Sequence, residues 1–324
     1  MKWFMDFSKK QIVDLAVDTY FGKSSNPKYT AEQRADGFHN VLQDLNKDYR
    51  SNKDKIFTIV EETVSEIAPK VVLENVKRWA EFKTFGDNEE VKFILKNGKI
   101  KAVEVALGGH VARQRIDKGS FTIESTALQA KVYEEYERVI GGQVDWSELI
   151  NLVINAINDA ILEKVYDALM SLIDKVPSVN TAKGTGTIVK KDFDKIISIV
   201  KAYGQPVIMG TPLALAELPL DKELATDADK MDIRLKGYLG TYRGCSVVEI
   251  ENSFEDGRNT KPVFDDSKIF IIPSGQERVI KVAMKGGMKL KTTEGTDWTT
   301  NFEAYQKAGV AVLAVNHIGI YEIV

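Results

Sequence analysis

The amino-acid sequence predicts an α+β protein in which helices and strands occupy separate stretches of the chain. Three observations support this fold class. Residues 1–86 carry charged and apolar positions at helical spacing, residues 87–132 change to the alternating pattern of β-strands, and a long apolar helix begins after Asp145. Helices and strands then alternate from about residue 185 to 290, and strands close the chain over 291–324.

The composition is that of an ordinary folded protein. With 324 residues, the chain is long enough for two compact domains or for one domain with extended additions. Hydrophobic residues make up 44% and charged residues 28%, which argues against global disorder. The net charge of −3 does not favour a chain that wraps nucleic acid. No apolar run is long enough for a transmembrane segment or a secretory signal. A single cysteine excludes an internal disulfide framework and fits a reducing cytoplasm.

Residues 1–86 are predicted to form a helical N-terminal arm. Helical spacing gives three segments, over about 8–20, 30–47 and 52–82. These helices carry many charges and only thin apolar stripes. We therefore expect them to lie against another part of the protein, because they have little apolar surface for a core of their own.

A β-hairpin is predicted within residues 87–132. The alternating run begins at Val91, and Asn97-Gly98 suits the positive backbone angles of a two-residue type I′ turn. After an irregular basic segment, a strand is expected to return over 121–132.

The most apolar helix of the chain is predicted from Asp145 to Val176. Asp145 is a suitable N-cap, and Pro177 disfavours helical geometry in the residue before it. At 1.5 Å per residue such a helix would span roughly 45 Å. Its polar residues recur every three or four positions as one narrow stripe, so most of its remaining surface can be buried. We expect one side to pack on the chain's own sheet and the other to lie near a neighbouring subunit.

The remainder of the chain has the pattern of an α/β unit followed by strands. Helix signals with capping residues alternate with short apolar runs of strand length. The expected elements are a helix over 190–204, a strand at 206–210, a helix from Thr211, strands near 245–251 and 267–275, a basic strand pair around 277–292, and one or two strands over 308–324 with a break near Asn316.

Two oppositely charged stretches lie on either side of the strand before the long helix. From residue 92 to 118, seven basic residues oppose two acidic ones, a balance of +5; from 134 to 148, five acidic residues oppose one basic residue, a balance of −4. A solvated surface is the simplest explanation of either stretch. However, a basic hairpin and an acidic platform on one chain are complementary between copies, and a repeated head-to-tail contact closes into rings or shells. The candidate contact residues are Lys92, Lys96, Lys99, Lys101, Arg113, Arg115, Glu134, Glu135, Glu137 and Glu148.

No motif indicates catalysis, a metal site or a cofactor. The three histidines and Cys245 are scattered without metal-ligand spacing, and Cys245 is expected to be a packed small hydrophobe. Residues 22–24 resemble the end of a phosphate-binding P-loop but lack its first glycine and its preceding strand. Asp265-Asp266 has no basic or nucleophilic partner nearby in sequence, which indicates a solvated turn. The nucleophile motif G-x-S-x-G is absent from the sequence. We therefore expect no enzyme activity and no cofactor.

The order of elements resembles the major capsid proteins of tailed bacteriophages of the Hong Kong 97 type. The resemblance covers essentially the whole chain in layout. Its sequence is most similar in three places: the long helix from Asp145 to Val176, the helix–strand–turn KKDFDKIISIVKAYGQPVIMGTP, and the passage GYLGTYRGCSVVEIE followed by SKIFIIPSG.

The resemblance implies a division of the chain into the named parts of that fold. Residues 1–86 would be the N-terminal arm, and residues 87–132 would be the extended E-loop hairpin with its return strand. Residues 133–184 would hold the spine helix of the peripheral (P) domain. Residues 185–290 would form the axial (A) domain, and 291–324 would return to the P domain. In some relatives an E-loop lysine forms a covalent link to a neighbour, but no lysine here can be assigned that role.

The implied function is self-assembly into hexamers and pentamers of an icosahedral phage head. Such a head encloses double-stranded DNA without sequence-specific binding. The implied partners are a separate scaffolding protein, a portal and decoration proteins, with no membrane. The protein would assemble in the host cytoplasm and reside in the virion. Two alternatives remain open: an encapsulin-type bacterial compartment shell, and a soluble α/β enzyme with residues 185–290 as its catalytic domain.

Overall fold

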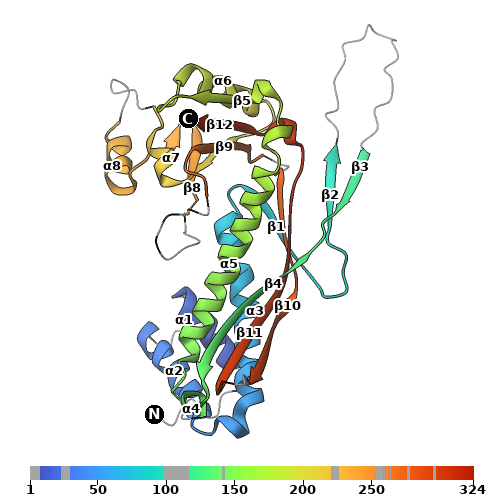
Figure 1. Cartoon of the computed structure of the whole chain (residues 1–324), viewed down its shortest axis with the longest axis vertical. Coiled ribbons are helices and arrows are strands. Elements are labelled where there is room, and N and C mark those ends of the chain that lie inside the picture. Colours follow the sequence, from blue (N-terminus) through green and yellow to red (C-terminus); the bar gives the residue numbers. More distant parts are fainter. Residues whose placement is uncertain are drawn as a thin grey trace.

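Two β-sheets, each with helices packed on it, form an elongated molecule (Figure 1). The four-stranded sheet runs along the long axis, and the six-stranded sheet lies at one end. The computed structural model describes residues 8–22, 30–97, 117–140, 143–219, 226–250, 264–275, 278–294 and 297–324, together with residues 252, 258, 260 and 262.

The elements follow the order expected from the sequence, with differences in extent. The α-helices are α1 (Lys9–Phe21), α2 (Ala31–Asn46), α3 (Tyr49–Val76), α4 (Tyr136–Ile140), α5 (Trp146–Met170), α6 (Lys190–Lys201), α7 (Pro212–Ala216) and α8 (Asp227–Lys236). The strands are β1 (Ala80–Phe85), β2 (Lys92–Asn97), β3 (Asp117–Thr122), β4 (Thr126–Glu135), β5 (Thr181–Gly184), β6 (Pro206–Gly210), β7 (Thr241–Tyr242), β8 (Cys245–Glu249), β9 (Lys268–Pro273), β10 (Ile280–Glu294), β11 (Thr299–Val312) and β12 (Gly319–Ile323).

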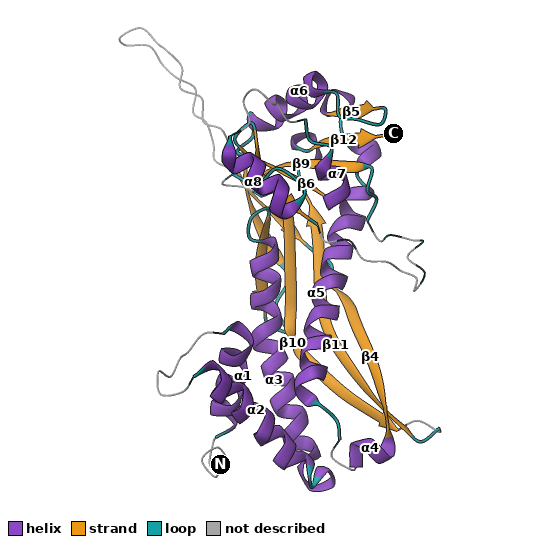
Figure 2. Ribbon diagram, turned by 90° about the vertical axis from the view of Figure 1, so that its left-hand side faces the viewer, coloured by secondary structure: helices purple, strands orange, loops and turns teal. Residues whose placement is uncertain are grey.

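Two long helices cover one face of the four-stranded sheet, whose strand order is β1-β10-β11-β4. Figure 2 shows α3 and α5 lying side by side along β10 and β11. In β11 burial alternates, so Phe302, Ala304 and Ala308 are buried, while the residues between them are more exposed. This two-residue period matches a sheet with one covered face. The helical N-terminal region therefore lies against the chain's own sheet, and α3 continues through Pro69 as a second spine helix.

An aromatic cluster joins these helices to the sheet at the end where α5 begins. The Trp146 ring packs edge-on against Phe302 at a centroid distance of 5.3 Å and against Phe57 at 5.9 Å. Tyr49 at the start of α3 stacks on the same indole at 6.3 Å. Trp146 is only 1% exposed. Large buried rings of this kind contribute strongly to core stability, so this cluster fixes the two helices against β11.

Residues 77–82, predicted as the end of a helix, do not continue the helix. Helix α3 ends at Val76, and β1 pairs in parallel with β10, with Ala80 opposite Ile280. Arg278 donates a hydrogen bond to the Ala80 carbonyl at 2.9 Å. The helical interpretation was wrong because the partner strand lies two hundred residues later in the chain, where local spacing cannot register it.

An ion pair with a buried lysine links β1 to β10. The Lys281 side chain is 3% exposed, and its ammonium pairs with the Glu81 carboxylate. Lys83 approaches the same carboxylate from the exposed side at 2.8 Å. Burial opposes ionisation of the Glu81 carboxyl, but the contacts with Lys281 and Lys83 outweigh burial and lower its pKa.

The base of the β2–β3 hairpin covers the upper part of the sheet's second face. Phe93 is fully buried in a small cluster with Val91, Ile123 and Ala283. The Lys83 and Lys281 ammonium groups lie 4.9 Å and 5.9 Å from the Phe93 ring centroid. These cation–π contacts connect the hairpin base to the ion pair below it.

The hairpin differs from its prediction in register. Asn97 pairs with Asp117, so the two-residue turn at Asn97-Gly98 is wrong, and residues 98–116 between the strands lie outside the described residues. The return strand expected over 121–132 is interrupted and belongs to two sheets, as β3 and β4. Local turn chemistry predicted the strand but could not predict where its partner begins.

The structure tests two predictions for the C-terminal region: the basic strand pair and the break near Asn316. The expected basic strand pair is one strand, β10, whose register shifts between Lys285 and Lys289. Gly286 permits this shift because its φ is +70°, a conformation that costs other residues energy. The break near Asn316 is confirmed: a short 3₁₀ turn separates β11 from β12.

The six-stranded sheet has the order β5-β12-β9-β6-β8-β7. Helix α6 packs on it through Phe193, Ile196 and Val200, and every residue of the central strand β6 is buried. Thr211 caps α7 with Pro212 in the first turn, as predicted. β12 belongs to this sheet whereas β11 belongs to the long one, so sheet membership divides residues 291–324.

The first prediction concerns the buried ion pair. Glu81→Gln leaves the Lys281 ammonium buried without its counter-charge, and we expect the free energy of unfolding at pH 7 to fall by about 2 kcal/mol, measured by urea denaturation. The matched control is Lys83→Met, which removes the exposed ion pair and the cation–π contact with Phe93 but leaves the buried pair intact, and it should cost less than about 1 kcal/mol.

The same pair has a defined pH dependence. The pKa of Glu81 is lower in the folded state, so its contribution is present above the ordinary carboxyl pKa and is lost as the pH falls through the folded value. The stability difference between wild type and Glu81→Gln should therefore shrink as the pH is lowered from 7 toward 3. A constant difference over that range would contradict the assignment.

Candidate assembly surfaces

The spine helix α5 has most of its apolar surface covered by its own chain. The Asp145 carboxylate accepts hydrogen bonds from the Ser147 and Glu148 amides at 2.9 Å and 3.2 Å, so the predicted N-cap is confirmed. The helix ends at Met170, before the predicted end at Val176. Its buried residues pack against α3 and β11, so its own chain covers more of its apolar surface than the sequence indicated. That its other side lies near a neighbouring subunit stays a prediction. The sequence could not show that α3 is a second spine helix.

A smaller apolar surface of α5 does remain accessible, beside the edge strand β4. Leu152 is 52% exposed and lines a groove of about 550 Å³ between α5 and β4. β4 is the last strand of its sheet, so the outer edge of its backbone has no described partner strand. Exposed strand edges are ready templates for pairing with another chain. The apolar lining includes Ala127, Leu128, Ala130, Val132, Leu152 and Ala156.

The basic hairpin is described only at its base. Lys92 begins β2 and its ammonium pairs with Glu90, while Lys96 lies opposite Lys118 in the ladder. The other predicted basic contacts, Lys99, Lys101, Arg113 and Arg115, lie outside the described residues.

The acidic residues do come together, at the opposite end of the long sheet. Glu134 and Glu135 end β4, Glu137 lies in α4, and Glu148 lies in the first turn of α5. Figure 2 shows these three elements meeting at one end of the molecule. Glu134 is paired with Arg138 at 2.5 Å. Among the described residues, Glu135 and Glu137 are exposed and have no ion-pair partner.

The described base of the hairpin lies far from the acidic end. Thr299 of β11 pairs with Glu135, and Ala311 of the same strand packs beside the hairpin base. Twelve residues of extended strand separate these positions, roughly 40 Å at 3.3 Å per residue. The described hairpin residues therefore do not contact the acidic end of their own chain.

Two exposed aromatic residues at the acidic end were not predicted. Tyr133 is 69% exposed on β4, and Trp298 is 79% exposed in the turn before β11. The sequence contains two signals that could have indicated them. The alternation of β4 places Tyr133 on one face with Lys131 and Glu135, and Trp298 stands within a polar turn sequence.

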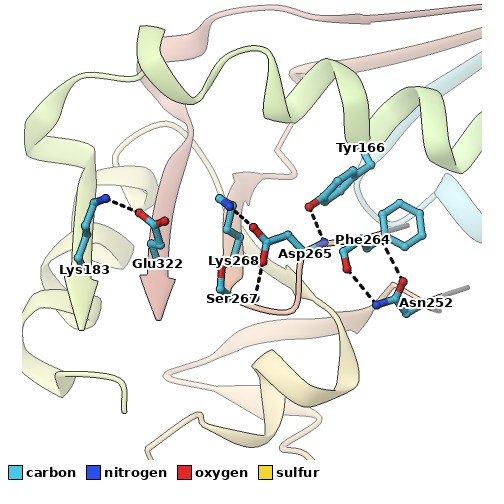
Figure 3. A network of polar contacts seen from close by, with 8 residues as sticks. All are labelled: Tyr166, Lys183, Asn252, Phe264, Asp265, Ser267, Lys268 and Glu322. Atoms are coloured by element: carbon cyan, nitrogen blue, oxygen red, sulfur yellow. Dashed lines mark hydrogen bonds and ion pairs between the residues drawn. The ribbon is translucent and has the colours of Figure 1, made fainter. Parts of the chain in front are cut away.

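The other end of the spine is joined to the six-stranded sheet by a polar network (Figure 3). The Asp265 amide donates to the Tyr166 hydroxyl of α5 at 2.6 Å. The Asp265 carboxylate accepts from Ser267 and pairs with Lys268. The interpretation of Asp265-Asp266 as a solvated turn without a basic partner is therefore wrong for Asp265. Its partner lies three residues later, and burial of Asp265 is outweighed by these contacts, which lower its pKa.

Two further contacts in Figure 3 extend this junction. The Asn252 side chain bridges the Phe264 backbone, donating to its carbonyl and accepting from its amide, both at 3.0 Å. Lys183 of β5 pairs with Glu322 of β12 at 2.6 Å. The Tyr166 contact joins α5 to the six-stranded sheet, and the other contacts order the loops and strands of that sheet. Cys245 is fully buried, as predicted for a packed hydrophobe.

Other kinds of site are not seen in the described part of the chain. It contains no group of three or more histidine, cysteine or acidic side chains placed to hold a metal ion. None of its helices combines the length and the apolar character needed to cross a membrane.

The fold is that of capsid proteins of the Hong Kong 97 type, as the sequence predicted. The chain resembles the "Capsid of native GTA particle" with a TM-score of 0.53 and 12% identity, over 77% of this chain and 89% of that one. A structure from Microbacterium phage Oxtober96 gives a TM-score of 0.51 and 12% identity, over 78% and 90%. The SrpI encapsulin of Synechococcus elongatus PCC 7942 gives a TM-score of 0.47 and 12% identity, over 76% of this chain and 86% of that one.

Sequence comparison identifies the family. The chain belongs to the family described as "SPbeta prophage-derived putative capsid protein YonB", whose model matches residues 9–322. Comparison with curated proteins finds no match. Membership of this family confirms the capsid-protein function predicted from the sequence and implies a structural role.

The second prediction tests the junction in Figure 3. Tyr166→Phe removes the acceptor of the part-buried Asp265 amide, and we expect it to lower the free energy of unfolding by about 1–2 kcal/mol in urea denaturation. The control is Tyr133→Phe, whose exposed hydroxyl should matter by less than about 0.5 kcal/mol. Equal effects of the two substitutions would contradict the role given to Tyr166.

Proposed function

We propose that this protein is the major structural subunit of a phage head, in which copies form the hexamers and pentamers of an icosahedral shell. The observation that carries the proposal is the family match over nearly the whole chain. The physical support is a long sheet whose acidic end lies about 40 Å from the described base of the hairpin, a separation that favours contact between molecules.

The parts of the chain take distinct roles in this proposal. Residues 1–86 act as the N-terminal arm, 87–132 as the E-loop, and 133–184 as the spine of the P domain. Residues 185–290 act as the A domain, and 291–324 return to the P domain. The intersubunit contacts join the basic residues Lys92, Lys96, Lys99, Lys101, Arg113 and Arg115 to the acidic residues Glu134, Glu135, Glu137 and Glu148.

The shell would enclose double-stranded DNA without reading its sequence, and the protein would catalyse no reaction. A whole-chain net charge of −3 suits a container, because a strongly basic wall would hold packaged DNA tightly. Its further partners would be a scaffolding protein, a portal and decoration proteins. Assembly would occur in the host cytoplasm, and the finished protein would reside in the virion.

The direct test is electron microscopy of the purified protein over a range of concentrations. Rings, sheets or shells are the expected result. A chain that remains monomeric at high concentration, alone and with its co-expressed scaffolding protein, would refute the proposal.

The third prediction tests the charge contact. Lys99→Glu with Lys101→Glu should raise the protein concentration needed for assembly at least tenfold, measured by light scattering, because like charges would then face the acidic end. The control, Lys47→Glu with Lys77→Glu, makes the same charge change on the exposed helical side. If both double variants assemble like wild type, the hairpin does not take part in the contact.

A further inference from the structure

The outer edge of β4 and the groove beside it form one surface. β4 is a strand of 10 residues, and all of them pair with β11 on the inner side. The outer side has no partner strand among the described residues. The groove of about 550 Å³ lies between β4 and α5, and Leu152 in its wall is 52% exposed. An occupant that fits both features supplies a strand for the edge and an apolar helix face for the groove.

The sequence of β4 is complementary to itself in antiparallel pairing. Its helix-facing side chains, Leu128, Ala130 and Val132, pack against the core beneath α3 and α5. Opposite residues of an antiparallel pair point to the same face, so a second β4 with its helices on the same side must pair even-numbered residues with even-numbered ones. With Ala130 opposite Ala130, Leu128 meets Val132 and Thr126 meets Glu134. Apolar residues then face each other on the helix side, and no like charges lie directly opposite.

The face of α5 beside the groove is complementary to itself in the same sense. Residues four apart form one ridge on a helix, and this ridge reads Glu148, Leu152, Ala156, Ala160 and Lys164. Its three apolar members line the groove. The ridge is acidic at one end and basic at the other, with Ala156 at its centre. An antiparallel copy therefore brings the Glu148 end to the Lys164 end and sets Leu152 against the small Ala160.

The spacing of strands and helices allows both pairings at once. Helix α5 packs on both β11 and β4 (Figure 2). Neighbouring strands are about 4.8 Å apart, so α5 of a copy joined through β4 would lie two strand spacings away, about 10 Å. Helices pack at about 8–10 Å. Ala130 and Ala156 both line the groove, so one two-fold axis beside them satisfies the strand pairing and the helix pairing together.

We propose that β4 and α5 form a two-fold contact, in which β4 pairs antiparallel with β4 of a second copy and Leu152 of each copy fills the groove of the other. This inference rests on the proposed self-assembly and adds a different kind of contact to it. A two-fold contact joins the same surface on both copies and closes on itself, so it cannot build a ring. The head-to-tail charge contact closes rings, and the β4 contact joins one ring to the next.

The fourth prediction separates shells from rings. Ala156→Lys places two ammonium groups face to face at the two-fold axis. It should raise the protein concentration needed for shell formation at least tenfold in light scattering, while electron micrographs still show rings. The thermal unfolding midpoint of the monomer should not change, because Ala156 is exposed. The matched control is Ala35→Lys, at an exposed position of α2, which should form shells like wild type.

A cross-link tests the register of the two strands. Directly opposite residues have Cα atoms about 4.5–5.5 Å apart, within reach of a disulfide, so Ala130→Cys should give a covalent dimer when shells are oxidised. In the control, Ala127→Cys, the two thiols would lie six residues apart along the strands, roughly 20 Å, and should not join. The native Cys245 is buried and does not compete. The readout is electrophoresis without reducing agent.

Two results would overturn the inference. One is an Ala156→Lys variant that forms shells like wild type. The other is shells of Ala130→Cys that give no more covalent dimer than those of Ala127→Cys. Both results leave the proposed function standing, which fails only if wild-type protein forms no shell.

Discussion

The packing of Trp146 between α3, α5 and β11 is the contact on which the rest of the molecule depends. The indole touches Tyr49, Phe57 and Phe302, so one ring holds together segments that are far apart in sequence. With this cluster in place, α3 and α5 lie flat on the long sheet, and the sheet keeps its two charged ends apart. The distance between the hairpin base and the acidic end is therefore set by the core.

The parts of the fold that could be predicted are those specified by nearby residues. Asp145 begins the spine helix, Thr211 and Pro212 begin α7, and the apolar run of β6 predicts a buried strand. Errors arose where a distant partner decides the structure. β1 is a strand only because β10 lies beside it, and β2 pairs with β3 across nineteen intervening residues rather than turning at Gly98.

The candidate site could be predicted in part for a similar reason. The sign of the charge on each surface follows from composition, and the acidic residues are brought together because β4, α4 and α5 are consecutive. The exposed side chains of Tyr133 and Trp298 were missed because β4 and the turn before β11 are adjacent only in the fold.

The parallel pairing of β1 with β10 has a consequence for the timing of synthesis. Glu81 and Lys281 are two hundred residues apart, so the helices made first emerge from the ribosome well before the strand that completes their sheet. Contacts of such long range slow folding, and the long layer can close only after β10 and β11 have been translated. The acidic end, where β11 lies beside β4, forms in that same last step. The long sheet is therefore complete only in a finished chain.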